Sequence, residues 1–485
     1  MNTPLRRLST VVAAMFLGLM LAATWVQYVQ APALNNDQRN VRTLYREFGS
    51  FRGPIVVGGQ AVASSTPVDD SYGYQRQYAP GALYAPVTGF YSIVYGRSGI
   101  EEWLNTELNG SADSLFYERL QDLVTGRQTR GASVELTIDP VVQQAAWDAL
   151  GDQAGAVVAL DPRTGAILAM VSKPTFDPNV LASHDLTAVR EAWDALQADP
   201  TEPMANRAIA GDTYPPGSTF KLVTAAAALE SGLTAETPVA APRTLTLPQT
   251  STVLNNFGGS ACSPTGAMTL ADALRISCNT AFAQIGIDLG EDELRAQAEA
   301  FGFDTPLNVP MRVTESHFPD DPDAPQTALS AIGQYEVRVT PLQMAMVAAA
   351  IGNGGVQMTP YLVQTVRSQD LTVVAETDPT ELARPISAST AAQLRDMMVG
   401  VVQSGTGRSA QISGVTVAGK TGTAQTTTEA APHAWFTAFA PAEAPQVAVA
   451  VVVEHGGSMG SEATGGAVAA PIARAVIQAA LGSGS

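Results

Sequence analysis

The residues best suited to covalent chemistry in this 485-residue chain are Ser218 and Lys221. They follow a Pro-Pro-Gly sequence, which cannot propagate a helix, and open a segment at 221–230 that is rich in helix formers. Because residues three apart share one face of a helix, the Lys221 amine is expected to reach the Ser218 hydroxyl. The segment is apolar nearly all round, as in a fully buried helix. Burial favours the neutral form of an amine, which can then activate a serine without histidine.

Lysine is rare in this chain, and its positions are informative. Lys173, Lys221 and Lys420 are the only lysines, and the other strongly basic residues are arginines. A guanidinium cannot give up its proton at working pH, so arginine replaces lysine as a charge but not as a proton acceptor. Lys420 opens Lys420-Thr421-Gly422-Thr423, directly after an apolar alternation that predicts a strand. Two of the three lysines therefore stand where chemistry could require the amine.

A third motif, Ser277-Cys278-Asn279, lies between the two lysine motifs and follows a helical pattern at 270–276. Each motif alone is a weak signal. Ser-x-x-Lys by itself is more often a capped helix start with a solvated lysine, and Lys-Thr-Gly-Thr by itself is more often a plain turn. The three together, in this order and with the first at a Pro-Pro-Gly helix start, argue against a chance combination.

With these motifs the sequence resembles the penicillin-recognising serine acyltransferases, and within them the class B penicillin-binding proteins, which are monofunctional peptidoglycan D,D-transpeptidases. The resemblance spans roughly residues 30–480 and looks closest to the short actinobacterial penicillin-binding protein A type. It implies an α+β fold of the penicillin-binding and serine β-lactamase-like kind. In this fold an antiparallel sheet is flanked by helices and joined by a helical lobe, a β-rich pedestal precedes it, and one transmembrane helix comes first.

The resemblance assigns roles to the residues that make and break bonds. Ser218 is the expected nucleophile and neutral Lys221 its base, acting on the D-Ala-D-Ala end of a peptidoglycan stem peptide. Ser277 and Asn279 would relay the proton to the leaving D-alanine and orient the amide of the donor. An amine from a neighbouring stem peptide would then attack the acyl-enzyme and form the cross-link. β-Lactams would mimic the donor and stay attached.

The same resemblance implies a substrate-binding strand. Lys420, with Thr421 and Thr423, would bind the terminal carboxylate of the donor, and Gly422 would let the peptide lie against the strand. The backbone N–H groups of Ser218 and Thr423 would form the oxyanion hole. No cofactor is implied. His184, His317 and His433 lack the spacing of zinc ligands, so no metal is assigned.

Alternative functions remain open at this point. A D,D-carboxypeptidase or a β-lactamase-type hydrolase uses the same motifs but passes the acyl group to water. A non-catalytic sensor of cell-wall peptide or a divisome scaffold would only bind. The stretch 456–460 matches the Gly-x-Ser-x-Gly motif of α/β-hydrolases, but those enzymes need a histidine after the serine, and His455 is the last one here. This stretch is better interpreted as a flexible glycine loop.

The pattern along the chain predicts three regions, with boundaries at residues 28 and 150. Residues 1–28 form the cytoplasmic tip and membrane anchor, 29–150 the extracytoplasmic pedestal or dimerisation-like domain, and 151–485 the transpeptidase domain. A mainly helical stretch is expected at 184–350. Helices are also expected at 140–150 and 467–481, and strands at 156–160, 166–171, 415–424, 435–440 and 447–454.

The N-terminus has the pattern of a single membrane span. Arg6 and Arg7 precede an uncharged stretch at 8–26, and Trp25 and Tyr28 are suitable interfacial anchors. The positive flank predicts a cytoplasmic N-terminus and an extracytoplasmic catalytic domain at the cell membrane. Cleavage as a signal peptide, after residue 23 or 33, is the alternative. Division or elongation proteins and a glycosyltransferase are the protein partners that the family resemblance implies.

Charge and cysteine content complete the picture. The formal net charge of −18, with no basic cluster, argues against nucleic acid as a partner. Cys262 and Cys278 are the only cysteines, in a compartment that permits oxidation. We expect a disulfide that closes a loop of about sixteen residues and stabilises the fold by about 3 kcal/mol. Two reduced, buried cysteines are the alternative.

Overall fold

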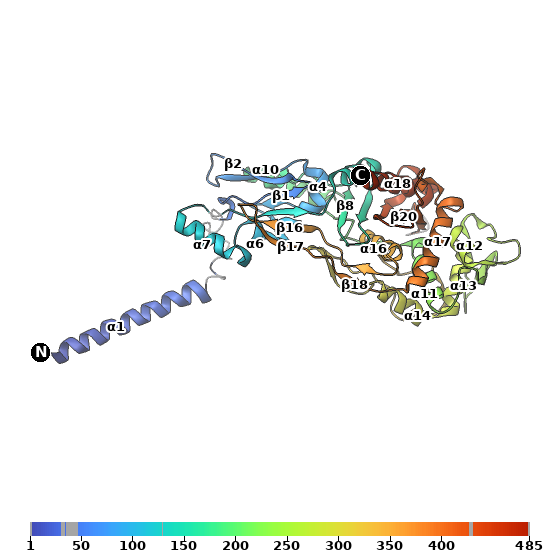
Figure 1. Ribbon diagram of the computed structural model, residues 1–485, viewed down its shortest axis with the longest axis horizontal. Helices are drawn as coiled ribbons and strands as arrows, with labels where there is room; N and C mark the ends of the chain where they lie inside the picture. Colours follow the sequence, from blue (N-terminus) through green and yellow to red (C-terminus); the bar gives the residue numbers. More distant parts are fainter. Residues whose placement is uncertain (1, 31–33, 35–46, 129, 426–429, 484–485) are drawn as a thin grey trace.

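The computed structural model describes residues 2–30, 34, 47–128, 130–425 and 430–483. Figure 1 shows an elongated molecule with a long N-terminal helix at one end. A strand-rich region follows it, and a larger region of helices and strands lies beyond. Two sheets, one in each of these regions, organise the chain.

The larger region is built on a five-stranded antiparallel sheet. Strand β21 is apolar at every position, and all of its residues are buried, as expected for a strand covered on both faces. The sheet order is β19 (Ala418–Ala424), β20 (His433–Ala440), β21 (Val447–Val453), β7 (Gly155–Leu160) and β8 (Ile167–Lys173). Strand β19 is therefore an edge strand. The sequence predicts these strands to within a few residues.

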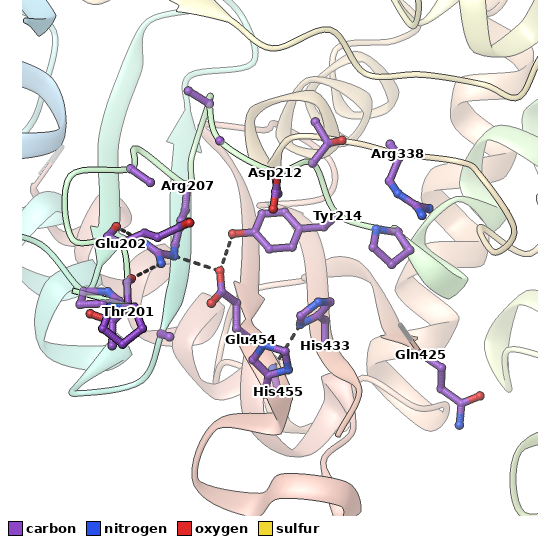
Figure 2. A pocket seen from close by; sticks show the side chains of 18 of the residues that line it. Thr201, Glu202, Arg207, Asp212, Tyr214, Arg338, Gln425, His433, Glu454 and His455 are labelled. Carbon is purple, nitrogen blue, oxygen red and sulfur yellow. Dashed lines mark hydrogen bonds and ion pairs between the residues drawn. The ribbon is translucent and has the colours of Figure 1, made fainter. Parts of the chain in front are cut away.

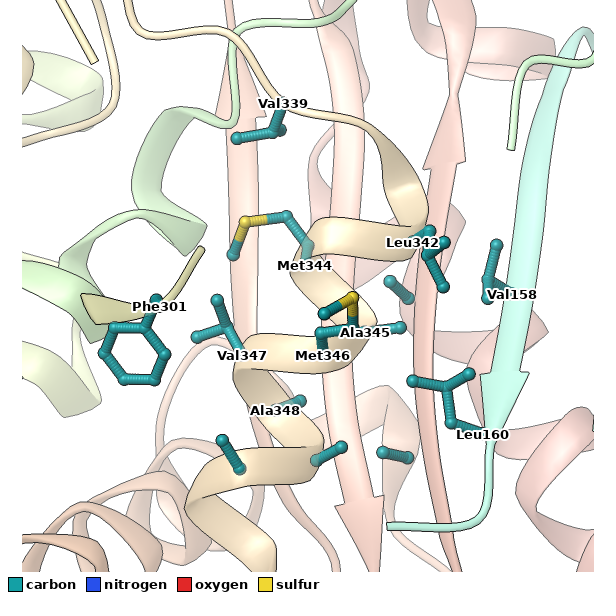
Figure 3. Packing of buried hydrophobic residues seen from close by; sticks show 14 of the residues in the cluster. Val158, Leu160, Phe301, Val339, Leu342, Met344, Ala345, Met346, Val347 and Ala348 are labelled. Atoms are coloured by element: carbon teal, nitrogen blue, oxygen red, sulfur yellow. The ribbon is translucent and has the colours of Figure 1, made fainter. Parts of the chain in front are cut away.

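Helices cover both faces of this sheet. Alternate residues of a strand face opposite sides, so Val158 and Leu160 pack toward α16 (Pro341–Gly352), as Figure 3 shows. Val157 packs on the other face, in the cluster that includes α8 (Pro140–Leu150) and α18 (Ala470–Ser483). Both ends of the catalytic region thus meet on one face of the sheet.

A helical lobe lies next to strand β19. Its central helix, α11 (Lys221–Glu230), is buried at every position from Lys221 to Leu229, as the apolar pattern predicts. Around it lie α12 (Leu270–Arg275), α13 (Asn279–Leu289), α14 (Glu291–Ala300), α15 (Ala324–Ser330) and α17 (Ala388–Ser404). The short strands of this half of the chain are β9 (Pro238–Ala240), β10 (Thr244–Thr246), β11 (Val253–Asn255), β12 (Ala267–Thr269), β13 (Leu307–Asn308), β14 (Arg312–Val313), β15 (Gln357–Met358) and β18 (Glu381–Ala383).

The pedestal contains a six-stranded mixed sheet. Its order is β17 (Val373–Glu376), β16 (Val363–Arg367), β6 (Ser133–Leu136), β1 (Ile55–Val57), β2 (Gln60–Pro67) and β3 (Tyr74–Tyr78). Strands β16 and β17 come from the C-terminal half of the sequence, whereas α8, before residue 150, packs on the catalytic sheet. Segments from both sides of residue 150 thus contribute to each region, which ties the two regions together.

The other elements of the first 200 residues are short. Strands β4 (Tyr91–Ser92) and β5 (Gly96–Arg97) form an antiparallel hairpin. The helices of this part of the chain, besides α1 and α8, are α4 (Gly81–Thr88), α5 (Gly99–Trp103), α6 (Asn105–Leu108), α7 (Phe116–Thr125), α9 (Asn179–Ala182) and α10 (Leu186–Ala198).

A buried ion cluster lies inside the pedestal. The Glu101 side chain is fully buried, and its carboxylate accepts hydrogen bonds from Arg52 Nε at 2.5 Å and Arg76 Nε at 2.6 Å. Tyr78 Oη donates to the same carboxylate at 3.1 Å. Burial alone would raise the pKa of Glu101, but the two guanidinium groups outweigh it and lower this pKa.

Helix α1 (Asn2–Thr24) continues into a π-helical turn at Trp25–Val29, and its described side chains are exposed. The stretch Thr3–Val29 is long and apolar enough to cross a membrane. Gly465–Gly482 passes the same test, but it is partly buried against the catalytic sheet and is a core helix. Of the two cleavage positions considered, the one at 31–33 lies outside the described residues.

Candidate active site

Ser218 lies in a short 3₁₀ turn, Gly217–Thr219, and α11 begins three residues later at Lys221. The turn is pressed against neighbouring backbone. Gly217 has φ +52°, and a Cβ at this position would lie 2.7 Å from the carbonyl oxygen of Thr423. Its N–H donates to the carbonyl of Gly333 at 2.9 Å. Only glycine fits here, and the close approach sets the half-buried Ser218 beside strand β19.

The amine of Lys221 is fully buried among polar atoms of the second motif. Lys221 Nζ donates to Asn279 Oδ1 at 2.7 Å and to the carbonyl of Ser277 at 2.8 Å. The Ser277 hydroxyl is 3.3 Å away. Within the described part of the chain, no hydrogen bond joins Lys221 to Ser218. The amine of Lys221 was predicted to reach Ser218, but in this structure its hydrogen bonds go to Ser277 and Asn279.

The second buried amine comes from strand β19. Lys420 is fully buried, and its Nζ donates to Ser277 Oγ at 2.8 Å and to the carbonyl of Thr421 at 2.8 Å. The Ser277 hydroxyl is thus shared by the two lysines. Strand, helix and loop, distant in sequence, bring Lys221, Ser277, Asn279 and Lys420 into one cluster.

Neither lysine in this cluster has a counter-ion among the described residues. Burial is the main cause that lowers the pKa of Lys221 well below 10.5, and the nearby Lys420 lowers it further. Burial lowers the pKa of Lys420 to about 7. The site can therefore hold a neutral amine at neutral pH, as a general base requires.

The second motif is held in a strained loop. Ser277 has φ +60°, a left-handed conformation that costs free energy for any residue other than glycine. Cys278, its neighbour, is joined to Cys262 by a disulfide with a Cα–Cα distance of 5.9 Å. The bridge anchors the loop that carries Ser277 and Asn279. Cysteine at the centre of this motif thus has a structural explanation.

Asn256 positions the motif from outside it. Its Oδ1 accepts hydrogen bonds from the backbone N–H groups of Asn279 at 3.1 Å and Thr280 at 3.0 Å, where α13 begins. Its side chain also donates to the carbonyl of Arg243 at 3.3 Å. Asn279 is thereby oriented toward Lys221. The sequence offers no signal for this role, because the contact is not local.

The rest of the strand motif lines the site. Thr421 Oγ1 is 2.6 Å from Thr406 Oγ1, a hydroxyl pair that motif analysis misses because Thr406 lies outside the three motifs. Thr423 is half-buried. A Cβ on Gly422 would lie 2.8 Å from the Trp435 side chain and 2.9 Å from the carbonyl of Pro216. Protein packing therefore already requires the glycine that was expected to make room for substrate.

A cavity of about 1040 Å³ adjoins the residues just before the nucleophile. Figure 2 shows its polar network, in which Glu454 Oε1 accepts from Tyr214 Oη at 2.5 Å and from Arg207 Nε at 3.0 Å. His433 Nδ1 accepts from the backbone N–H of His455 at 3.2 Å. Burial lowers the pKa of His433 to about 4, so this ring is neutral at pH 7. The network fixes Tyr214, four residues before Ser218.

The described residues contain no group of three or more histidine, cysteine, aspartate or glutamate side chains placed to hold a metal ion. The site consists of a serine, two lysines, an asparagine and hydroxyls. This donor set suits proton transfer and anion binding rather than metal coordination.

Comparison with known proteins bears on what this cluster is. A family model for the penicillin-binding protein transpeptidase domain matches residues 155–478. The chain belongs to this family. A second family model, for the penicillin-binding protein A dimerisation domain, matches residues 52–134. The two matches cover the catalytic region and most of the pedestal of this penicillin-binding protein.

Full-length relatives agree with this assignment. The chain is 48% identical to peptidoglycan D,D-transpeptidase PbpA of Mycolicibacterium smegmatis, over 100% of both chains. It is 46% identical to the PbpA of Mycobacterium tuberculosis, over 99% of both. The solved structure of penicillin-binding protein A from M. tuberculosis as a ceftriaxone acyl-enzyme complex superposes with a TM-score of 0.87 at 46% identity. The superposition covers 90% of this chain and 100% of the M. tuberculosis chain.

These likenesses confirm the family inferred from the three motifs and the α+β fold expected for it. The catalytic roles of individual residues remain predictions. The cluster of Lys221, Ser277, Asn279 and Lys420 beside Ser218 is the physical basis on which those roles can be proposed.

Proposed function

We propose that this penicillin-binding protein is a peptidoglycan D,D-transpeptidase that works through an acyl-enzyme on Ser218. The observation that carries the proposal is the pair of buried amines, Lys221 and Lys420, which meet at one hydroxyl and have no counter-ion within the described ranges. Such a pair combines a proton acceptor with an anchor for a carboxylate. The 46–48% identity to D,D-transpeptidases over essentially the full length supports the substrate class.

Acylation follows from this arrangement. Ser218 Oγ attacks the carbonyl carbon of the penultimate D-alanine, and its proton passes to neutral Lys221 Nζ. The tetrahedral oxyanion accepts hydrogen bonds from the backbone N–H groups of Ser218 and Thr423. Close packing of Gly217, which precedes Ser218, on the backbone of Thr423 supports this assignment. The C–N bond to the terminal D-alanine then breaks. Its nitrogen takes the proton from Lys221 by way of Ser277 Oγ.

Binding of the donor uses the strand motif. Lys420, in its protonated form, and the hydroxyls of Thr421 and Thr423 bind the terminal carboxylate. Asn279 orients the amide of the donor. A carboxylate beside Lys420 favours the charged amine and raises the pKa of Lys420 above its value in the free enzyme. With substrate bound, Lys420 is thus the cation and Lys221 the neutral base.

Transfer completes the cycle. An amine of a second stem peptide attacks the ester carbonyl, loses a proton to the site, and displaces Ser218 Oγ, which recovers its proton. The products are a cross-linking amide and free enzyme. A β-lactam presents the same carbonyl, but its leaving nitrogen stays tethered, so the acyl-enzyme persists.

The membrane assignment is part of this proposal. We place α1 in the cell membrane as a single, retained span with Arg6 and Arg7 on the cytoplasmic side and the catalytic region outside. Division or elongation proteins and a glycosyltransferase are the proposed partners there. N-terminal sequencing of the mature protein should begin at or near Met1. A start after residue 23 or 33 would contradict retention of the span.

Labelled penicillin tests the nucleophile. Wild type should take up one covalent label per chain, and Ser218→Ala should take up none. Ser231→Ala, an exposed serine at the other end of α11, is the control and should label normally. Covalent label retained by Ser218→Ala would defeat the assignment and leave only a binding protein. Peptide mapping of labelled wild type should place the adduct on Ser218.

Product analysis separates transfer from hydrolysis. The enzyme is given a D-Ala-D-Ala donor and an added D-amino acid as amine acceptor. We expect release of D-alanine together with the new amide. Release of D-alanine with only the hydrolysed donor would identify a carboxypeptidase instead.

A further inference from the structure

Helix α7 (Phe116–Thr125) in the pedestal exposes its apolar face. Phe116 is 54% exposed, Tyr117 82%, Leu120 48% and Val124 80%. At 3.6 residues per turn these four side chains fall within about 100° of the helix circumference. A surface helix of a globular protein normally packs such a stripe on the core. Here the stripe faces away from the protein.

The polar side of α7 faces the protein instead. Glu118, Arg119 and Asp122 are half-buried, on the side opposite the apolar stripe. Arg119 Nη1 donates to the carbonyl of Ser111 at 2.8 Å, and the Glu118 carboxyl interacts with the Ser368 hydroxyl at the end of β16. Specific polar contacts therefore hold the helix with its apolar side outward. The orientation is a property of the fold rather than of a loosely attached segment.

The place of α7 indicates what covers it. Figure 1 shows α7 at the end of the pedestal that is nearest to α1. About 17 peptide units separate the end of the α1 segment from residue 47, and they span at most about 60 Å when fully extended. This end of the pedestal is thus tethered close to any membrane that α1 crosses.

Local charge agrees with a lipid surface. The chain as a whole carries −18, but residues 116–130 contain Arg119, Arg127 and Arg130 against two acidic residues. Arg127 and Arg130, just after the helix, are exposed. Basic side chains beside an apolar stripe with aromatic residues are the composition of helices that lie in a membrane interface.

We propose that α7 lies in the lipid–water interface of the membrane that α1 spans, with Phe116, Tyr117, Leu120 and Val124 inserted among the acyl chains. This inference rests on the membrane anchoring proposed above, but not on the chemistry at Ser218. Together α1 and α7 give the protein two points of attachment. They limit the orientations that the pedestal can take relative to the membrane.

The test uses the full chain in vesicles of phosphatidylcholine with phosphatidylglycerol and no other protein. Because Cys262 and Cys278 are bonded to each other, a thiol-reactive fluorophore labels only an introduced cysteine. Tyr117→Cys reports on α7. The matched control, Ala296→Cys, is an exposed position on α14 at the opposite end of the molecule. Acylation by labelled penicillin should be unchanged in both and shows that each variant is folded.

Lipids that carry a nitroxide quencher at a shallow acyl position provide the readout. We expect them to reduce the fluorescence at position 117 by roughly twofold or more, with little effect at position 296. Leu120→Glu in the Tyr117→Cys background should abolish most of this quenching, whereas Thr125→Glu, on the polar side, should retain it. Equal, weak quenching at 117 and 296 would overturn the proposal and leave a protein partner as the cover of this face. Lack of penicillin labelling would instead count against the proposed function.

Discussion

The pedestal and the catalytic region each contain a cluster of deeply buried charged side chains, and the two clusters differ in their partners. In the pedestal, Glu101 is paired with Arg52 and Arg76, and the carboxylate stays ionised because two guanidinium groups surround it. In the catalytic region, Lys221 and Lys420 are buried as completely but meet hydroxyl, amide and carbonyl oxygens. Their pKa values fall instead.

The difference shows what makes a base. Burial penalises the charged form of any group, and the neighbours decide whether the charge survives. An opposite charge turns a buried group into a structural ion pair, whereas neutral acceptors and a like charge turn it into a proton acceptor. Among the residues that the structure describes, no carboxylate pairs with Lys221 or Lys420, and this sets their reactivity.

The largest effect is expected from Lys221→Arg. The guanidinium keeps a positive charge and cannot accept the Ser218 proton, so the rate of acylation by labelled penicillin should fall by about 10²- to 10⁴-fold. Lys173→Arg is the control, because this third lysine lies outside the cluster and contacts the carbonyls of Trp147 and Gly151. Normal acylation of Lys221→Arg would refute the role of this lysine as base.

The pedestal should respond in stability rather than in rate. Glu101→Gln leaves two buried guanidinium groups without their carboxylate, and we expect the free energy of unfolding in urea to fall by about 3–5 kcal/mol. The exposed neighbour supplies the control, Glu102→Gln, which should change it by less than about 0.5 kcal/mol. Because the folded-state pKa of Glu101 lies below 4.5, its stabilisation is lost as the pH falls through that lower value. The free energies of unfolding of wild type and Glu101→Gln should therefore approach each other below that pKa. If Glu101→Gln lowered the free energy of unfolding no more than Glu102→Gln does, the contrast between the two clusters would be removed.

The pH profile of acylation gives the smallest but most specific effect. Lys221 must be neutral and Lys420 charged, so the rate should rise with pH on the acid side and fall again as Lys420, with a pKa of about 7 in the free enzyme, loses its proton. Lys420→Arg keeps its charge at every accessible pH. The decline on the alkaline side should disappear in this variant even though its rate is lower. An unchanged decline would assign the alkaline limb to another group.

The sequence predicts the parts of the site that local patterns encode. The rarity of lysine isolates Lys221 and Lys420, the Pro-Pro-Gly sequence marks the turn at Ser218, and the uniformly apolar β21 identifies a strand of a covered sheet. These signals depend on residues that are close in sequence. The chemistry of the motifs is therefore predictable before any coordinates are known.

Long-range contacts are not predictable in this way. Nothing near Asn256 indicates that its side-chain Oδ1 accepts hydrogen bonds from the start of α13, and nothing in β16 indicates that it pairs with β6 of the pedestal. The same holds for the donors and acceptors around Lys221. Its helix predicts proximity to Ser218, but its hydrogen bonds go to Ser277 and Asn279, which fold back from more than fifty residues away.

The central claim, that a buried amine without a counter-ion is neutral, can be measured directly. With only three lysines, NMR of protein labelled with ¹³C and ¹⁵N at lysine should give three side-chain signals, each assigned by the loss of one signal in an arginine variant. We predict that Lys221 titrates well below 10.5 and Lys420 near 7. Titration of both amines near 10.5 in the folded, penicillin-reactive protein would contradict the account.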